Sequence, residues 1–104
     1  MQTCLIYMTA GSMDEARRIG QALVSKRLAA CVNIIDRMDS FYWWEGKVQS
    51  AKEVVMIAKT RESLVPRLTQ EVRHLHSYEC PCIVSLPITG GFEPFLDWIV
   101  KETG

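Results

Sequence analysis

The sequence predicts an α+β domain in which two main helices cover one face of an antiparallel sheet. Three observations support this class. The hydrophobic period switches between strand-like and helical along the chain, the segments follow the order β-α-β-β-α-β, and two long strand-like runs meet at a two-residue turn. With 104 residues, the chain has the length of a single small domain, residues 1–104, with a core of its own.

The first strand and the first helix are expected within residues 3–27. The stretch "TCLIYMTA" is typical of a short buried strand, and it ends at a glycine. Ser12 is a good N-cap, and "SMDE" gives the capping-box spacing with Glu15. Apolar residues then recur at helical spacing, and Lys26 and Arg27 suit the negative end of the helix dipole.

Two β-like runs follow, "CVNIIDRMDSFYWW" over 31–44 and "KVQSAKEVVMIAKT" over 47–60, and they meet at "EG". Gly46 can take the positive φ that such a tight turn needs. A strand of about 14 residues extends more than ~40 Å, whereas a helix of about 13 residues extends only about 20 Å. The hairpin must therefore overhang the domain with "FYWWEG" at its end. Soluble monomers rarely leave such aromatic surface in water, so we expect a homo-oligomer, and cyclic symmetry is the expected form.

The last third of the chain repeats the alternation. Helical spacing returns over "SLVPRLTQEVRHLH", and Pro66 places the helix start near Ser63 because proline is tolerated only in a first turn. "CIVSLP" predicts a short buried strand, and Pro94 suits the first turn of a final short helix. The complete order is the split βαβ, or ferredoxin-like, arrangement followed by a terminal helix.

Composition argues against several classes of partner. The chain has 12 basic and 12 acidic residues, which removes the broad attraction that most nucleic-acid and membrane-surface binding relies on. No stretch approaches the roughly 18 to 20 apolar residues that cross a bilayer. The first residues lack the basic start of a signal peptide, so the four cysteines are expected as thiols of a cytoplasmic protein.

The stretch "HLHSYECPC" at 74–82 concentrates residues that can carry chemistry. His74 and His76 differ by about 200° on a helix, so they cannot share a metal, and His74 is expected to be solvated. His76 falls at the helix end, where it either bonds the last carbonyls or has a function. Cys80 and Cys82 lack the C-x-x-C spacing of structural zinc. A C-x-C pair can bind Cu(I), yet cysteine is also a common buried residue, so packing and ligation both remain open, with interior sulfurs favoured.

No catalytic residue is predicted. The chain has no Walker loop, nucleophile elbow or dinucleotide fingerprint, and sequence cannot show whether a thiolate lies beside an imidazole. RNA binding is disfavoured by the neutral charge and by the lack of the aromatic RNP1 pattern.

Several stretches, taken together, resemble one known family. They are "LAACVN" at 28–33, "SFYWWEG" at 40–46, "EVVMIAKT" at 53–60 and "HSYECP" at 76–81, and in their order and spacing they are similar to the CutA divalent-cation tolerance proteins. The resemblance implies a homotrimer of ferredoxin-like subunits, similar in architecture to the PII signalling proteins. It also implies a cytoplasmic, non-enzymatic protein linked to tolerance of divalent metals, copper above all.

The resemblance also suggests metal ligands. The positions that the family proposals use for metal are occupied here by Cys31, His76 and Cys82. Cys82 stands where the family commonly has a glutamate, and Ser77 stands where it commonly has a proline. A thiol in place of a carboxylate favours Cu(I) or Zn over hard ions.

A second expected site is a small-ligand pocket at the subunit interface, built from aromatic and a few polar groups. Its candidate residues are Tyr42, Trp44, Lys59, His76 and Tyr78. The simpler reading is that the aromatics pack at the interface and that Lys59 is solvated. With such a pocket, the alternative function is a small-molecule sensor or an enzyme. The expected partners are further copies of the chain and either a metal ion or a small ligand.

Overall fold

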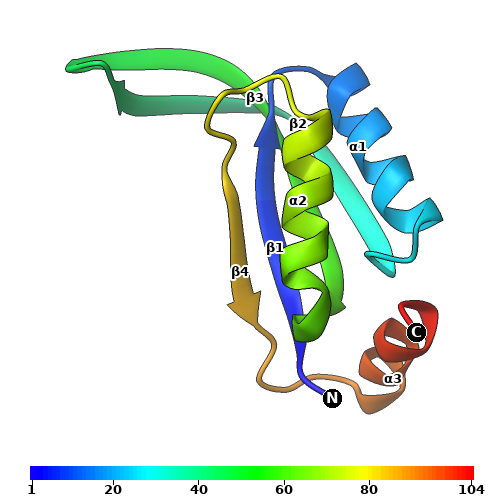
Figure 1. The fold of residues 1–104 in the computed structure, drawn as a ribbon. Helices are drawn as coiled ribbons and strands as arrows, with labels where there is room; N and C mark the ends of the chain where they lie inside the picture. Colours follow the sequence, from blue (N-terminus) through cyan, green and yellow to red (C-terminus); the bar gives the residue numbers. More distant parts are fainter.

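The computed structural model describes residues 1–104 as a four-stranded antiparallel sheet with two helices on one face and a third helix at its end (Figure 1). The sheet order is β2-β3-β1-β4, which confirms the predicted ferredoxin-like fold. None of the helices has the length and apolar character needed to span a membrane. In chain order the elements are β1 (Thr3–Ala10), α1 (Met13–Ser25), β2 (Cys31–Trp44), β3 (Lys47–Arg61), the short 3-10 helix η1 (Glu62–Leu64), α2 (Val65–Leu75), β4 (Ile83–Pro87) and α3 (Glu93–Glu102).

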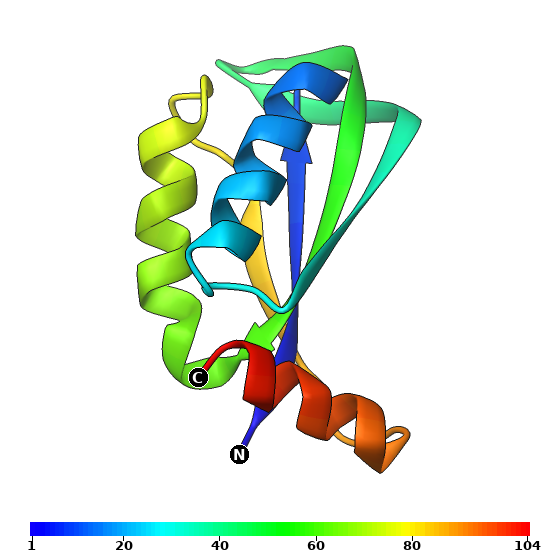
Figure 2. The ribbon, with the colours of Figure 1, turned by 90° about the vertical axis from the view of Figure 1, so that its right-hand side faces the viewer.

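The core lies between the sheet and the helices α1 and α2, which share one side of the sheet (Figures 1 and 2). Alternate side chains of β1 and β3 point into it, because successive residues of a strand face opposite sides. Fully burying an aliphatic side chain contributes roughly 1.5 to 3 kcal/mol. The largest buried side chains are Ile6, Met8, Ile19, Leu23, Met56, Leu68 and Val72.

The start of α1 confirms the N-cap and adds a longer connection. The Ser12 hydroxyl accepts the Glu15 N–H at 3.2 Å. The Glu15 carboxylate does not complete the box on Ser12; it accepts the N–H groups of Gly11 at 3.4 Å and of Ser77 at 2.9 Å. A buried carboxylate thereby ties the first turn of α1 to the loop that follows α2.

The hairpin of β2 and β3 is as long as the sequence predicts, with strands of 14 and 15 residues. Glu45 and Gly46 form its turn with φ of 51° and 77°, as a type I′ turn requires. Its far end projects well beyond the helices and β4, away from both chain termini (Figure 1). The molecule measures 44 × 25 × 23 Å, and its radius of gyration of 14.1 Å exceeds the roughly 13 Å typical of this length.

A β-bulge interrupts the hairpin. Ile35 pairs with Val55 and Met38 pairs with Glu53, so two residues of β2 oppose one residue of β3. Arg37, within the bulge, has a φ of 68°. Because β2 has one extra residue here, the β2 side chains beyond the bulge face the opposite side from the one that simple alternation along β2 would give them. The bulge therefore keeps Met38 and the residues at every second position after it on the same face as Glu53. We call the part beyond the bulge, residues 38–53, the ribbon.

The sheet face opposite α1 and α2 is not covered by either of them, and we call it the open face; α3 lies at its end, where Arg61 donates to Thr103. It is largely apolar: Leu5 and Tyr7 of β1 are half-buried, and Val84 and Leu86 of β4 are each 49% exposed. On the outer side of β4 no strand is paired, because β4 is an edge of the sheet. An apolar face beside an unpaired edge is a typical contact surface for another chain.

Candidate functional site

A cavity of about 630 Å³ opens on the open face, between β1, the ribbon and residues 78–82. Its volume falls within the usual range of small-molecule sites. Three of the residues predicted from the sequence, Tyr42, Trp44 and Tyr78, line it together. The bulge explains how Tyr42 and Trp44 reach this face, since one-to-one pairing of all the β2 residues beyond Ile35 would turn their side chains to the other side of the ribbon. We call this the aromatic pocket.

Tyr78 is fixed in the pocket wall by three contacts. Its hydroxyl donates to Glu53 Oε2 at 2.9 Å, and its ring lies 4.6 Å from that of His76, centroid to centroid. A Cβ at Gly11 would lie 3.3 Å from the Tyr78 hydroxyl oxygen, so glycine permits this close approach. Burial, the hydrogen bond to Glu53 and the Glu53 charge raise the pKa of Tyr78 to about 12.

His76 connects the end of α2 to β1. Tyr78 N–H donates to His76 Nδ1 at 3.0 Å, and His76 Nε2 lies 2.7 Å from the carbonyl oxygen of Thr9. A carbonyl can only accept, so Nε2 carries the proton and the imidazole is the neutral tautomer. The side chain is buried, and both ring nitrogens are already used within the chain. The histidine therefore supports the loop that carries Tyr78.

Glu15, in the first turn of α1, stabilises the same loop through its carboxylate. Burial on its own would raise the pKa of the Glu15 carboxyl. Hydrogen bonds from the Ser77 hydroxyl and from the N–H groups of Ser77 and Gly11 outweigh this effect, so the pKa of the carboxyl is lowered. The carboxylate is thus charged, satisfied and structural.

Lys59 lies elsewhere on the open face. Its ammonium donates to Asn33 Oδ1 at 2.6 Å and lies 3.6 Å from Cys31 Sγ. Lys59 pairs with Leu5, four residues before Thr9 on β1, and it does not line the aromatic pocket. Within one chain, the structure therefore does not bring Lys59 to His76 and Tyr78.

The three metal candidates do not converge within one chain. Cys31 is beside Lys59 at one end of the open face, whereas His76 and Cys82 are near the Thr9 end of β1. No group of three or more His, Cys, Asp or Glu side chains is placed to hold a metal ion. Cys82 lines the aromatic pocket, and burial together with the Glu53 charge raises the pKa of its thiol.

The four cysteines are free thiols with different surroundings. Cys4 is buried in the core, as expected of the buried strand that carries it. Cys82 is half-buried, but Cys80 is exposed, which corrects the expectation that both sulfurs are interior. The reason is local: β4 begins only at Ile83, so Cys80 lies in a bend outside the strand.

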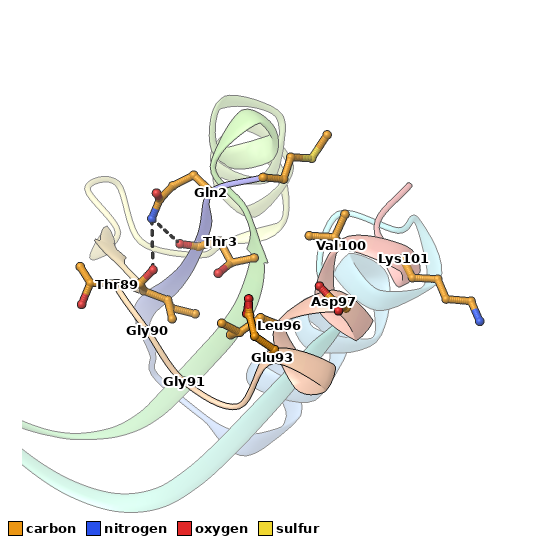
Figure 3. Close-up of a pocket in the computed structure, with 12 residues that line it drawn as sticks. Gln2, Thr3, Thr89, Gly90, Gly91, Glu93, Leu96, Asp97, Val100 and Lys101 are labelled. Carbon is orange, nitrogen blue, oxygen red and sulfur yellow. Dashed lines mark hydrogen bonds between the residues drawn. The ribbon is translucent and has the colours of Figure 1, made fainter.

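A second hollow, of about 650 Å³, lies between the N-terminal residues and α3 (Figure 3). The Gln2 side chain crosses one side of it and donates to the carbonyl oxygens of Thr3 at 3.1 Å and Ile88 at 3.2 Å. Glu93, Asp97 and Lys101 of α3 line the opposite side. None of the residues predicted for a site lies here, and its walls are mostly polar or glycine.

Sequence reasoning missed several residues of the aromatic pocket, and Glu53 and Tyr7 are the two that make contacts in its wall. Glu53 is half-buried and holds Tyr78, and Tyr7 donates its hydroxyl to Met38 Sδ at 3.5 Å in the pocket wall. Their alternation along the strands placed them on the open face, but only the bulge brings Tyr42 and Trp44 to the same face.

Comparison with known proteins gives one consistent result. The family model described as "CutA1 divalent ion tolerance protein" matches residues 4–102. A protein from Archaeoglobus fulgidus named "Divalent-cation tolerance protein CutA" is 51% identical over 94 residues, which cover 90% of this chain and 91% of the relative. The rice relative "Protein CutA 1, chloroplastic" is 42% identical, and this chain spans only 56% of its length.

Solved structures agree in fold. A structure described as the periplasmic divalent cation tolerance protein CutA from Archaeoglobus fulgidus has a TM-score of 0.95 and 47% identity, covering 98% of this chain and 99% of that one. A divalent cation tolerance protein from Thermus thermophilus has a TM-score of 0.96 and 41% identity, with the same coverage of 98% and 99%.

Proposed function

Because this chain belongs to the CutA family of divalent-cation tolerance proteins, we propose that it is a homotrimer linked to tolerance of divalent cations, copper above all. In this proposal it acts without catalysing a reaction and binds a metal ion or a small ligand at its subunit interfaces. The observation that carries the proposal is the ribbon. It overhangs the domain with aromatic side chains on both of its faces, and one chain alone cannot cover them.

The exposure of these side chains is large. Phe41 is 76% and Trp43 is 73% exposed on one face of the ribbon, while Tyr42 and Trp44 are more than two-fifths exposed on the other. Burying apolar surface stabilises by about 25 cal/mol per Å², so covering this surface with another chain is strongly favourable. The open face and the unpaired edge of β4 offer complementary contacts for the ribbon of a neighbour.

Light scattering coupled to gel filtration tests the assembly. We expect a mass three times that of the 11.9 kDa chain at micromolar concentration. Leu86→Glu on the open face should dissociate the assembly, because a buried unpaired charge is costly. Val24→Glu is the matched control, since Val24 is 40% exposed on α1, away from the open face. A wild-type protein that stays a single chain contradicts the proposal.

For metal, we propose ligation between chains, with Cys31 and Cys82 as the thiolates. Both are on the open face, the surface that association would cover, and both are free. His76 can join them only by giving up its bond to Thr9 O or to Tyr78 N. Two soft sulfur ligands favour Cu(I) or Zn(II) over Mg(II) or Ca(II).

Calorimetry with Cu(I), Cu(II) and Zn(II) tests this ligand set. Cys31→Ser and Cys82→Ser are each expected to weaken Cu(I) binding by at least about tenfold. Cys80→Ser is the control, because Cys80 is exposed and is not one of the proposed ligands. Identical binding by wild type and by a His76→Ala, Cys82→Ser double variant would remove these two residues from the site.

A cytoplasmic location belongs to the same proposal and is supported by the four unpaired thiols. The alternative function is a small-molecule sensor or an enzyme that uses the aromatic pocket. It is favoured by one observation, that Tyr42, Trp44 and Tyr78 form one cavity of ligand size. Native mass spectrometry of protein purified without chelator distinguishes a bound organic molecule from a bound metal.

A further inference from the structure

We propose that the aromatic pocket binds a small organic cation, of the alkylammonium or quaternary ammonium class. This inference rests on the proposed small-ligand site and names the chemistry of its ligand. It is drawn from the aromatic rings that surround the cavity, the sign of the charges in its wall, and the way those charges are spread.

The first observation is the aromatic lining of the cavity. Four aromatic side chains of the open face line the cavity, from β1, from the ribbon and from the loop after α2: Tyr7, Tyr42, Trp44 and Tyr78. The face of an aromatic ring carries negative charge, and it attracts an ammonium group within about 6 Å of the ring centre. Trp and Tyr are the best partners for this interaction, and all four rings are of these two types.

The charged groups in the wall are all acidic. Asp39, Glu53 and Glu79 line the cavity, whereas no lysine, arginine or histidine does. Asp39 is paired with Lys52 outside the lining, which leaves two formal negative charges, on Glu53 and Glu79. Glu53 uses only Oε2 for the Tyr78 hydroxyl, and its Oε1 has no hydrogen-bond partner in the chain.

A compact metal ion does not fit this arrangement. Metal ligation needs several donors within about 2.0 to 2.6 Å of one point. The acids and thiols of the pocket form no such group of three. A bulky ammonium needs only ring faces and a carboxylate within reach, so spread charges and a roomy apolar wall suit it better.

Choline and its neutral isostere 3,3-dimethyl-1-butanol provide the test, because they differ in a single atom, nitrogen against carbon. Binding is followed by NMR titration of the wild-type protein in the assembly it forms, whose mass is measured on the same sample. We expect choline to bind about 5- to 30-fold more tightly than the alcohol. Trp44→Leu and Glu53→Gln should weaken choline binding by a similar factor and leave the alcohol unaffected within about twofold.

Phe92→Leu is the control, since Phe92 is exposed but does not line the pocket. Equal binding of choline and the alcohol would show an apolar cavity only and would overturn the inference. Absence of binding by either probe would overturn it too and would show that a neighbouring chain fills the pocket. The mass measurement and copper calorimetry are read separately, so a trimer that binds copper but not choline retains the proposed function and loses only this inference.

Discussion

At the scale of single residues, the loop 76–79 is held by groups that look functional in the sequence but act structurally. Both ring nitrogens of His76 form hydrogen bonds, to Thr9 and Tyr78. The Glu15 carboxylate accepts hydrogen bonds from Gly11 and Ser77. Their shared effect is to fix Tyr78 against Glu53. A histidine at the end of a helix can therefore position the wall of a pocket without taking part in catalysis.

Replacing Glu15 tests this role. Glu15→Gln should lower the free energy of unfolding by about 1 to 3 kcal/mol at pH 7, because a buried charge-assisted hydrogen bond is lost. The folded pKa of Glu15 lies below its usual value of 4.5, so its contribution is full above pH 4.5 and is lost as the pH falls through the folded pKa. In urea denaturation, the difference between wild type and variant should thus shrink in acid.

Asp14→Asn is the control for this experiment, since the Asp14 side chain is 93% exposed in the same helical turn. A Glu15→Gln variant as stable as Asp14→Asn at pH 7 would remove the structural role of the carboxylate.

Tyr78 gives a second prediction with the opposite sign in pH. Its folded pKa of about 12 exceeds the usual 10.0, so its contribution is full below pH 10 and is lost as the pH rises through 12. Tyr78→Phe should cost about 1 kcal/mol at pH 7, and this difference should fall at higher pH. Denaturation at pH 7, 9 and 11 measures it, with Tyr42→Phe as the comparison. A pH-independent difference would show that the Glu53 bond is not responsible.

At the scale of elements, the bulge in β2 decides what the ribbon presents. The Ile35–Val55 and Met38–Glu53 pairs enclose one extra residue, and this residue directs Tyr42 and Trp44 to the open face. Phe41 and Trp43 consequently face the other side. Both faces of the ribbon carry aromatic side chains. The bulge therefore determines which pair of rings lines the pocket, but it does not change how apolar the ribbon is.

Deleting Arg37 should remove the bulge without turning the ribbon over. Asp36 would then oppose Val54 and Met38 would still oppose Glu53, so Tyr42 and Trp44 would stay on the open face. The expected result is retained choline binding and a retained near-UV circular dichroism, whereas loss of a residue from a regularly paired strand would reverse its faces. Arg37→Gly is the control: it keeps the register and relieves the φ of 68°, so its stability should rise by up to about 1 kcal/mol. Loss of choline binding after the deletion, with the fold retained, would contradict the assignment of register.

At the scale of the whole molecule, shape and surface lead to the same conclusion. The molecule is elongated, at 44 × 25 × 23 Å. It has an exposed aromatic ribbon, an apolar open face and an unpaired edge strand, so much of its apolar surface remains outside its own core. The proposed trimer covers it, and the stability of each subunit then depends on its neighbours.

The thermal midpoint is therefore expected to depend on protein concentration. Dilution from about 100 to 1 μM should lower the Tm measurably, because mass action favours dissociation and dissociated chains unfold more easily. Scanning calorimetry at several concentrations checks this. For the Leu86→Glu variant the Tm should be lower and independent of concentration, and a concentration-independent Tm in the wild type would argue against coupled folding and assembly.

The sequence by itself determined the class of fold, the order of elements, the overhanging hairpin and the family, because these depend on local periodicity, caps and turns. Only the tertiary structure decided the sites. Lys59 fell beside Cys31 instead of Tyr78, Cys80 proved exposed, and Glu53 and Tyr7 joined the pocket. The physical reason is that a site joins residues from separate elements, and their meeting depends on strand register. A single bulge in β2 sets the strand register of the whole ribbon, and the hydrophobic pattern of the sequence does not reveal it.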